Sequence, residues 1–163
     1  MKILVFGKRK FNDFMQYNAI NDDNVEEQDM LIVSINNYYD PGMGTDKNGV
    51  RSYFKRNHSN VLIMHFGDYS EEFVLRVIHE GPTGIFNDYK AKVLYDFIKK
   101  NKDKKMAVIH CGAGISRSGA VGAFIQDTYG TQTWEEFKRK NSQIEPNGWV
   151  LKLLREQLRK DNG

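Results

Sequence analysis

The chain has 163 residues, of which 40% are hydrophobic, and its 24 lysines and arginines against 21 aspartates and glutamates give a formal net charge of +3 at pH 7. This length and composition are typical of one domain with a single buried core, which we assign to residues 1–163. They exclude a membrane-spanning helix, since no window approaches about 18 uninterrupted apolar residues, and the mild charge gives no reason to expect a nucleic-acid partner, although it does not rule one out.

Four short segments are almost continuously apolar and predict β-strands at residues 2–6, 30–35, 61–66 and 106–110. The first of them is too short for a signal peptide, so we interpret it as a strand. A strand that is covered on one face alone alternates polar and apolar side chains. The continuous pattern therefore indicates a sheet that is covered on both faces.

Helical patterns lie between and after the strands, at residues 11–18, 71–79, 88–100, 118–129 and 133–140, and again after Pro146. Asn87 is predicted to cap the helix at 88–100, and Thr133 and Glu136 match a capping box. Pro146 suits the entry to the last helix. This alternation predicts the α/β class: a single-domain sandwich with a central, mostly parallel sheet of four or five strands flanked by helices.

A polar segment at residues 36–60 is longer than an ordinary connection between elements. It carries aromatic and basic side chains that suit contacts with a phosphorylated substrate: Tyr38, Tyr39, Arg51, Tyr53, Lys55 and Arg56. A surface excursion with contacts of its own explains the segment equally well. Its role is left open at this point.

The segment at residues 110–118 reads His-Cys-Gly-Ala-Gly-Ile-Ser-Arg-Ser and holds the single cysteine, Cys111. It lies between a predicted strand and a predicted helix, where unpaired N–H groups and the helix dipole stabilise anions such as a phosphate group and a thiolate. Gly112 and Gly114 allow consecutive N–H groups to turn inward. We therefore predict that phosphate is bound by Gly112, Ala113, Gly114, Ile115, Ser116 and Arg117.

The side chains of this loop suit nucleophilic chemistry. Arg117 offers a planar fork that grips two phosphate oxygens. The same positive field is expected to lower the pKa of Cys111 below the roughly 8.5 of a free thiol, so that a thiolate attacks phosphorus. Ser118 can donate a hydrogen bond to the sulfur, and His110 is expected to orient the loop.

Residues 110–118 resemble the signature of the cysteine-dependent protein tyrosine phosphatase superfamily, His-Cys-x5-Arg-Ser/Thr. Residues 144–151 resemble the Pro-Asn-x-aromatic element that opens the last helix of small dual-specificity phosphatases, and the resemblance extends over about residues 30–160. It implies that Cys111 is the nucleophile, Arg117 binds phosphate and Ser118 assists breakdown of a phosphocysteine intermediate. Asn147 is a further candidate, either for supporting the loop or for positioning water, and an ordinary turn role explains it equally well.

A general acid is needed to protonate the leaving group, and in this superfamily a loop aspartate upstream of the cysteine supplies it. Asp68 follows the third predicted strand, where the resemblance puts the acid-bearing loop, but its distance from Cys111 along the chain requires an insertion, for which residues 71–84 are available. Asp88 is nearer, yet it lies in the first turn of a predicted helix, where the dipole favours the charged carboxylate. A third alternative is that neither residue is the acid.

The substrate class is narrowed by what the loop lacks. No lysine stands between Cys111 and Arg117, whereas the lipid-directed relatives that this loop resembles carry basic residues there. We therefore predict a phosphorylated protein or peptide substrate, with phosphotyrosine favoured over phosphoserine and phosphothreonine. RNA 5′-phosphatase activity and a catalytically weak phosphate-binding module are the alternatives. The sequence argues against a thiol-coupled reductase, which would need further cysteines. It also argues against a sulfurtransferase, because the loops of that class lack the Arg-Ser ending.

The remaining expectations concern the setting of the protein. A lone cysteine has no disulfide partner in the chain, which predicts a reducing, cytoplasmic location. The chemistry above requires neither a metal ion nor a cofactor. We expect a monomer with no membrane partner.

Overall fold

The structure is a computed structural model and describes residues 1–38, 50–77 and 84–163. Four strands in this part of the chain form one sheet, in which every neighbouring pair is parallel and the order is β1-β4-β2-β3. The strands are β1 (Lys2–Gly7), β2 (Met30–Asn36), β3 (Val61–His65) and β4 (Met106–Cys111). The predicted α/β class is confirmed, with a fully parallel sheet in place of a mostly parallel one.

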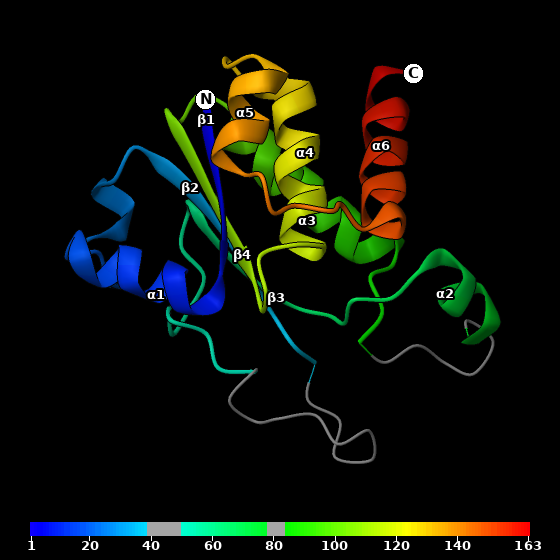
Figure 1. Cartoon of the computed structure of the whole chain (residues 1–163), viewed down its shortest axis with the longest axis horizontal. Coiled ribbons are helices and arrows are strands. Elements are labelled where there is room, and N and C mark those ends of the chain that lie inside the picture. Colours follow the sequence, from blue (N-terminus) through cyan, green and yellow to red (C-terminus); the bar gives the residue numbers. More distant parts are fainter. Residues whose placement is uncertain (39–49, 78–83) are drawn as a thin grey trace.

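Helices cover both faces of the sheet, as Figure 1 shows. One face carries α1 (Lys8–Tyr17) and a short 3-10 helix (Val25–Glu27). The helices on the other side are α3 (Asp88–Lys100), α4 (Arg117–Tyr129), α5 (Trp134–Lys140) and α6 (Gly148–Asn162). A further helix, α2 (Glu71–Val77), follows β3. No helix in the described ranges is long and apolar enough to cross a membrane.

The strands bury side chains on both faces, which explains their continuous apolar pattern. Ile32 and Val108 pack with Phe11 of α1, whereas Val33 and Ile109 belong to the larger core cluster under α3, α4 and α6. Neighbouring positions of one strand thus enter opposite cores. The sequence prediction of a sheet covered twice is confirmed, and the strand ends agree with it to within one residue.

Predicted helix signals agree with the structure at most positions. The Asn87 side chain accepts a hydrogen bond from the Lys90 N–H, and Thr133 forms the capping box with Glu136. The first helix begins at Lys8, three residues before the prediction, because residues 8–10 are all charged and give no apolar signal. Of the predicted helix at residues 71–79, the part beyond Val77 lies outside the described residues, as does Tyr39.

The β1 edge of the sheet is hydrogen-bonded by side-chain amides. On the outer side of β1, the Val5 N–H donates to Asn141 Oδ1 over 2.8 Å, and Asn141 Nδ2 donates to the Ile3 carbonyl over 3.0 Å. Gln143 Nε2 donates to the Val5 carbonyl over 2.9 Å. The connection between α5 and α6 thus supplies the hydrogen bonds that another strand would make.

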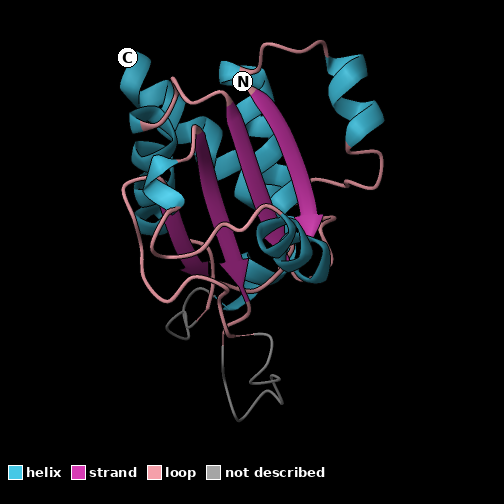
Figure 2. Ribbon diagram, turned by 90° about the vertical axis from the view of Figure 1, so that its left-hand side faces the viewer, coloured by secondary structure: helices cyan, strands magenta, loops and turns pink. Residues whose placement is uncertain are grey.

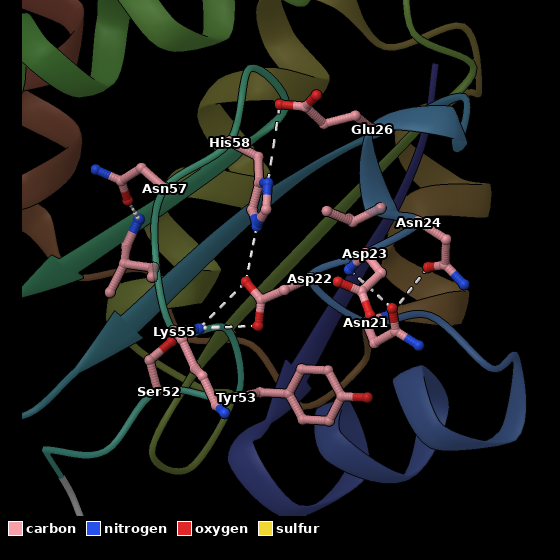
Figure 3. Close-up of polar contacts among 12 residues, drawn as sticks. Asn21, Asp22, Asp23, Asn24, Glu26, Ser52, Tyr53, Lys55, Asn57 and His58 are labelled. Carbon is pink, nitrogen blue, oxygen red and sulfur yellow. Dashed lines mark hydrogen bonds and ion pairs between the residues drawn. The ribbon is translucent and has the colours of Figure 1, made fainter.

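An acidic clasp holds the end of the long polar segment (Figure 3). Asp22 lies 2.7 Å from His58 Nε2 and accepts hydrogen bonds from the Lys55 N–H at 3.1 and 3.3 Å. Glu26 lies 3.8 Å from His58 Nδ1 and accepts from the Ser59 N–H over 3.1 Å. Residues 55–59 are thereby tied to the connection between α1 and β2.

Candidate active site

The parallel strands bring their carboxyl ends to one edge of the sheet, where the arrows of Figure 2 point. The loop at residues 112–116 starts at this edge, after β4 ends at Cys111, and leads into α4 at Arg117. Asn37 follows β2, and Phe66 to Asp68 follow β3. Side chains from distant parts of the sequence therefore surround the loop, as is usual at such an edge.

Cys111 is buried at the end of β4, with only 2% of its surface exposed. Its Sγ lies 3.0 Å from Ser118 Oγ and 3.3 Å from the Gly114 nitrogen, which donates its N–H to the sulfur. Ser118 belongs to the first turn of α4 and is fully buried. The sulfur is thus held between a hydroxyl and a backbone donor.

The pKa of Cys111 lies below its ordinary value as the balance of opposing effects. Burial acts most strongly and raises the pKa, because it disfavours the charged thiolate. Hydrogen bonds from the Ser118 side chain and backbone, the positive charge of Arg117 and the Gly114 N–H act in the other direction and together outweigh burial. The direction of this shift is the one expected from the sequence.

The two glycines that the sequence singled out differ in role. Gly114 has φ +74°, and a Cβ there would lie 2.3 Å from the Gly7 nitrogen, so the loop packs directly on the junction between β1 and α1. Gly112 does not have a positive φ. A Cβ at Gly112 would instead lie 3.3 Å from Arg117 Nη2, because the guanidinium passes over this residue.

Arg117 is the first residue of α4 and only 7% of its surface is exposed. Its Nη1 donates to Asn37 Oδ1 over 2.9 Å and to the Phe66 carbonyl over 2.8 Å. Both acceptors are uncharged. The guanidinium is therefore fixed at Nη1 while its positive charge remains available to an anion at the loop.

Asp68 is exposed and contacts the loop directly. Its Oδ1 accepts hydrogen bonds from Ser116 Oγ over 2.8 Å and from Asn147 Nδ2 over 2.7 Å. No described residue donates a hydrogen bond to Oδ2. Asp88, the other aspartate weighed from the sequence, is the first residue of α3 and lines a surface cleft with Tyr89 and Lys92.

Asn147 connects three parts of the site. Besides Asp68, its Nδ2 donates to the Tyr69 carbonyl over 2.9 Å, and its N–H donates to the Ser116 carbonyl over 2.9 Å. Its Oδ1 accepts from the Val150 N–H and caps α6. The residue therefore ties the segment around Asp68 and the loop to the start of the last helix.

His110 lies beneath the loop and is fully buried. Burial lowers the pKa of His110 to about 4, with the hydrogen bond to the Cys111 carbonyl acting the other way and the charge of Lys8 adding to the decrease. The ring is therefore neutral at pH 7. Its Nδ1 lies 3.2 Å from the Cys111 carbonyl, which can only accept, so Nδ1 carries the proton and Nε2 accepts from Ser34 Oγ at 2.7 Å.

The rest of the loop is held by its backbone. The Ile115 carbonyl accepts from the Glu145 N–H over 2.9 Å, and the Gly112 carbonyl accepts from the Lys8 N–H over 3.0 Å. Ala113 packs with its carbonyl beside Gly7. Every predicted loop residue thus belongs to one connected arrangement.

Sequence reasoning missed Asn37, Ser34 and the Phe66 carbonyl as neighbours of the loop. Each of them lies in or directly after a predicted strand, and side chains at the carboxyl ends of parallel strands meet. That signal was present in the sequence. The strand order was not, so β2 could not be recognised as the neighbour of β4.

Among the described residues, no group of three or more His, Cys, Asp or Glu side chains has an arrangement that could hold a metal ion. The donor atoms at the loop are N–H groups, a guanidinium and hydroxyls, which suit an anion.

Comparisons with known proteins return matches in structure alone: no protein-family model matches the sequence, and no curated protein matches it. One solved structure similar to this chain is that of the human tyrosine phosphatase-like serine/threonine/tyrosine-interacting protein. The match has 21% sequence identity and a TM-score of 0.47, and it covers 96% of this chain and 87% of that chain. Another is Tk-PTP in its active form, with 15% identity, a TM-score of 0.43 and coverage of 96% and 90%. With TM-scores below 0.5, neither bears on what this chain binds or hydrolyses.

Proposed function

We propose that this protein hydrolyses phosphate monoesters on proteins through a phosphocysteine intermediate, with Cys111 as the nucleophile. The observation that carries the proposal is the buried Cys111 sulfur, 3.0 Å from Ser118 Oγ and 3.3 Å from the Gly114 nitrogen, in a loop beside the guanidinium of Arg117. A thiolate, inward N–H groups and a fixed cation at the start of a helix are the groups that phosphoryl transfer to sulfur requires.

The first step forms the phosphorus–sulfur bond and breaks the ester bond. The phosphate dianion binds to the loop N–H groups and to Arg117, whose attachment to Asn37 and Phe66 keeps it in place. The Cys111 thiolate attacks phosphorus in line with the leaving oxygen. Asp68 is the proposed proton donor to that oxygen, and its Oδ2 is the atom that would carry the proton, because Oδ1 already accepts two hydrogen bonds.

The second step returns the enzyme to its starting state. Water attacks the phosphocysteine and gives its proton to the Asp68 carboxylate, and the phosphorus–sulfur bond breaks to release phosphate. Ser118 Oγ donates a hydrogen bond to the departing thiolate, for which its 3.0 Å distance from the sulfur is suitable. His110, neutral and held by Ser34, keeps the Cys111 carbonyl in position.

Phosphotyrosine is the favoured substrate. The loop has no lysine that would meet the further phosphates of a polyphosphoinositide. Ile115 of the loop and Tyr38, which follows Asn37 in the chain, are each 38% exposed and offer contacts to an aromatic ring. Phosphoserine and phosphothreonine are shorter and would gain less from these contacts.

The central test is hydrolysis of p-nitrophenyl phosphate by the wild type and by Cys111→Ser, side by side in EDTA with a reductant. The expected result is activity in the wild type and its loss in the variant, since a serine hydroxyl is not ionised at neutral pH. Activity that survives in Cys111→Ser contradicts the proposal. No activity in either protein favours the phosphate-binding module instead.

The role of Asp68 is tested separately with Asp68→Asn. Loss of a proton donor slows esters with poor leaving groups, so we expect a large decrease in kcat/KM on phosphotyrosine, roughly 100-fold or more, and a smaller one on p-nitrophenyl phosphate. Asp88→Asn is the matched control and should retain activity on both. An equal decrease on both substrates in Asp68→Asn contradicts the acid role.

A further inference from the structure

An apolar groove is lined by residues of α2, of the segment that leads into α3, and of α6. Its volume is about 310 Å³. Six apolar side chains make up most of its wall: Val74, Leu75, Ile85, Phe86, Trp149 and Leu153. A volume of this size accommodates one large aliphatic or aromatic side chain together with part of the backbone that carries it.

One part of the groove lining is held by a hydrogen bond, and another part is exposed to solvent. Phe86 is 1% exposed, and its carbonyl accepts a hydrogen bond from Trp149 Nε1 over 2.7 Å, which fixes the indole ring. Leu75 is 55% exposed although it lines the same groove. Covering a leucine with this much exposed surface by another apolar group is energetically favourable.

The rim of the groove is negatively charged, although the chain as a whole is positive. Asp88 and Glu156 line it, and within the described ranges neither carboxylate has a hydrogen bond or an ion pair. Lys152, the cation of the lining, is paired with Glu71 over 2.6 Å, and Lys90 nearby binds the Ile85 carbonyl over 3.0 Å. The charge therefore favours a partner that carries a lysine or arginine beside its apolar group.

The groove adjoins the candidate active site on two sides. Trp149 lies two residues after Asn147, so the Cα atoms of Trp149 and Asn147 are at most about 8 Å apart. The Asn147 side chain in turn donates a hydrogen bond to Asp68. Ile85 follows Gly84, whose carbonyl accepts from the Gly67 N–H over 2.7 Å, directly before Asp68. An extended peptide advances about 3.3 Å per residue, so a phosphorylated residue in the loop and a side chain in the groove can belong to one short segment.

Resting on the proposed function, we infer that this groove binds the segment that flanks the phosphorylated residue of a protein substrate, through one apolar side chain next to a lysine or arginine. The apolar side chain packs on Leu75 and Trp149. The basic side chain pairs with Asp88 and Glu156. The loop thus selects the phosphate while the groove selects the sequence around it.

The kinetic test uses phosphotyrosine peptides with a Gly-Ser background, in which a Leu-Arg pair is moved from position to position on either side of the phosphotyrosine. At one placement we expect kcat/KM to rise roughly tenfold over the parent peptide. Leu75→Asp should abolish this advantage, and Glu156→Lys should transfer it to a peptide with Leu-Glu. Both variants should retain wild-type kcat/KM on p-nitrophenyl phosphate.

A matched control is Tyr17→Asp, which introduces the same charge at an apolar residue of α1 that is 90% exposed and does not line the groove. It should keep the full preference for the Leu-Arg peptide. An equal loss in Tyr17→Asp and Leu75→Asp, or equal kcat/KM for every placement in the wild type, overturns the inference.

A binding test separates failure of the groove from failure of the catalytic proposal. Trp149 reports on the groove by its fluorescence in a Trp134→Phe background, and the unphosphorylated Leu-Arg peptide serves as the ligand. Saturable change in emission that Leu75→Asp weakens at least tenfold supports the groove even if p-nitrophenyl phosphate is not hydrolysed. No change, or a concentration-dependent dimer that Leu75→Asp abolishes, overturns it, the latter because a second copy then occupies the groove.

Discussion

A few individual contacts determine the direction in which the pKa of the Cys111 thiol is shifted. Burial alone would raise its pKa and leave an inert thiol, as is common for cysteines in cores. Donors from Ser118 and Gly114 and the charge of Arg117 lower the pKa instead. The neighbours of Cys111 thus outweigh the effect of its burial on the pKa.

Asn37 permits a test at the same scale, because it holds Arg117 Nη1 from outside the signature. Asn37→Ala should weaken inhibition by inorganic phosphate about tenfold, since a hydrogen bond to a charged group contributes about 1.5–3 kcal/mol. Asn37→Asp keeps an acceptor but adds a negative charge beside the guanidinium, so phosphate should bind more weakly there too. An inhibition constant that is unchanged in both variants would show that Phe66 alone fixes the arginine.

At this scale the sequence predicted that the signature residues lie close to one another. Cys111, Arg117 and Ser118 lie close together in the chain, at the two ends of one loop, so their proximity follows from spacing. Asn37 was not predicted, because its position depends on which strands are neighbours. The contact of Asp68 with Ser116 likewise joins residues that only the tertiary structure brings together.

At the scale of elements, the turn from β4 into α4 depends on one glycine. In Gly114→Ala the new Cβ would lie 2.3 Å from the Gly7 nitrogen and 2.5 Å from the Phe6 carbonyl carbon, and both are backbone atoms that cannot turn aside. The positive φ adds strain of about 1–2 kcal/mol. We expect a decrease of at least about 2 kcal/mol in the free energy of unfolding, measured by urea denaturation.

The matched variant is Gly112→Ala, whose Cβ would meet only the end of the Arg117 side chain, at 3.3 Å. Its stability should stay within about 0.5 kcal/mol of the wild type, while phosphate affinity decreases because the guanidinium has to shift. Equal destabilisation in the two variants would contradict the distinction between these glycines.

Elements with local signals were predicted most accurately. Asn87 and Thr133 mark helix starts through bonds to residues three positions away, so the sequence alone contains both partners. The start of α1 was placed too late because this helix is anchored by Phe11 and Met15 in the core, while its first turn is charged. Local patterns fail where packing with a distant strand decides the boundary.

At the scale of the whole molecule, the clasp around Asp22 joins two segments that precede β2 and β3. Burial raises the pKa of Asp22, but the hydrogen bonds from His58 and from the Lys55 N–H, with the charges of His58 and Arg56, outweigh it and the pKa is lowered. A folded pKa below the unfolded value of about 3.9 stabilises the fold above that pH, and this contribution is lost as the pH falls through the folded pKa.

Asp22→Asn should therefore lower the free energy of unfolding at pH 7, and the difference from the wild type should shrink below about pH 4. Denaturation curves of both proteins at pH 7, 5 and 3.5 measure this. Asp23→Asn is a suitable control, because Asp23 lies next in the chain and is not bound to His58. A difference that stays constant over this range would mean that the charge of Asp22 contributes nothing.

The α/β class and nearly all elements were predictable at this scale. Continuously apolar strands and amphipathic helices can each be recognised from local sequence patterns, and their order along the chain indicates the class. The strand order was not, since it is decided by which parallel crossovers pack together. The role of residues 36–60 was left open, and the contacts that hold residues 55–59 could not be predicted because their carboxylates lie on the other side of β2 in the sequence.

The amides of Asn141 and Gln143 along β1 also bear on how the molecule behaves in crowded solution. A peptide or a second copy that approaches this rim as a fifth strand would have to displace three hydrogen bonds, at Ile3 and twice at Val5, before it gained any of its own. Unprotected strand rims are common starting points for fibrils. Here two side chains from a loop make this rim a poor template for growth.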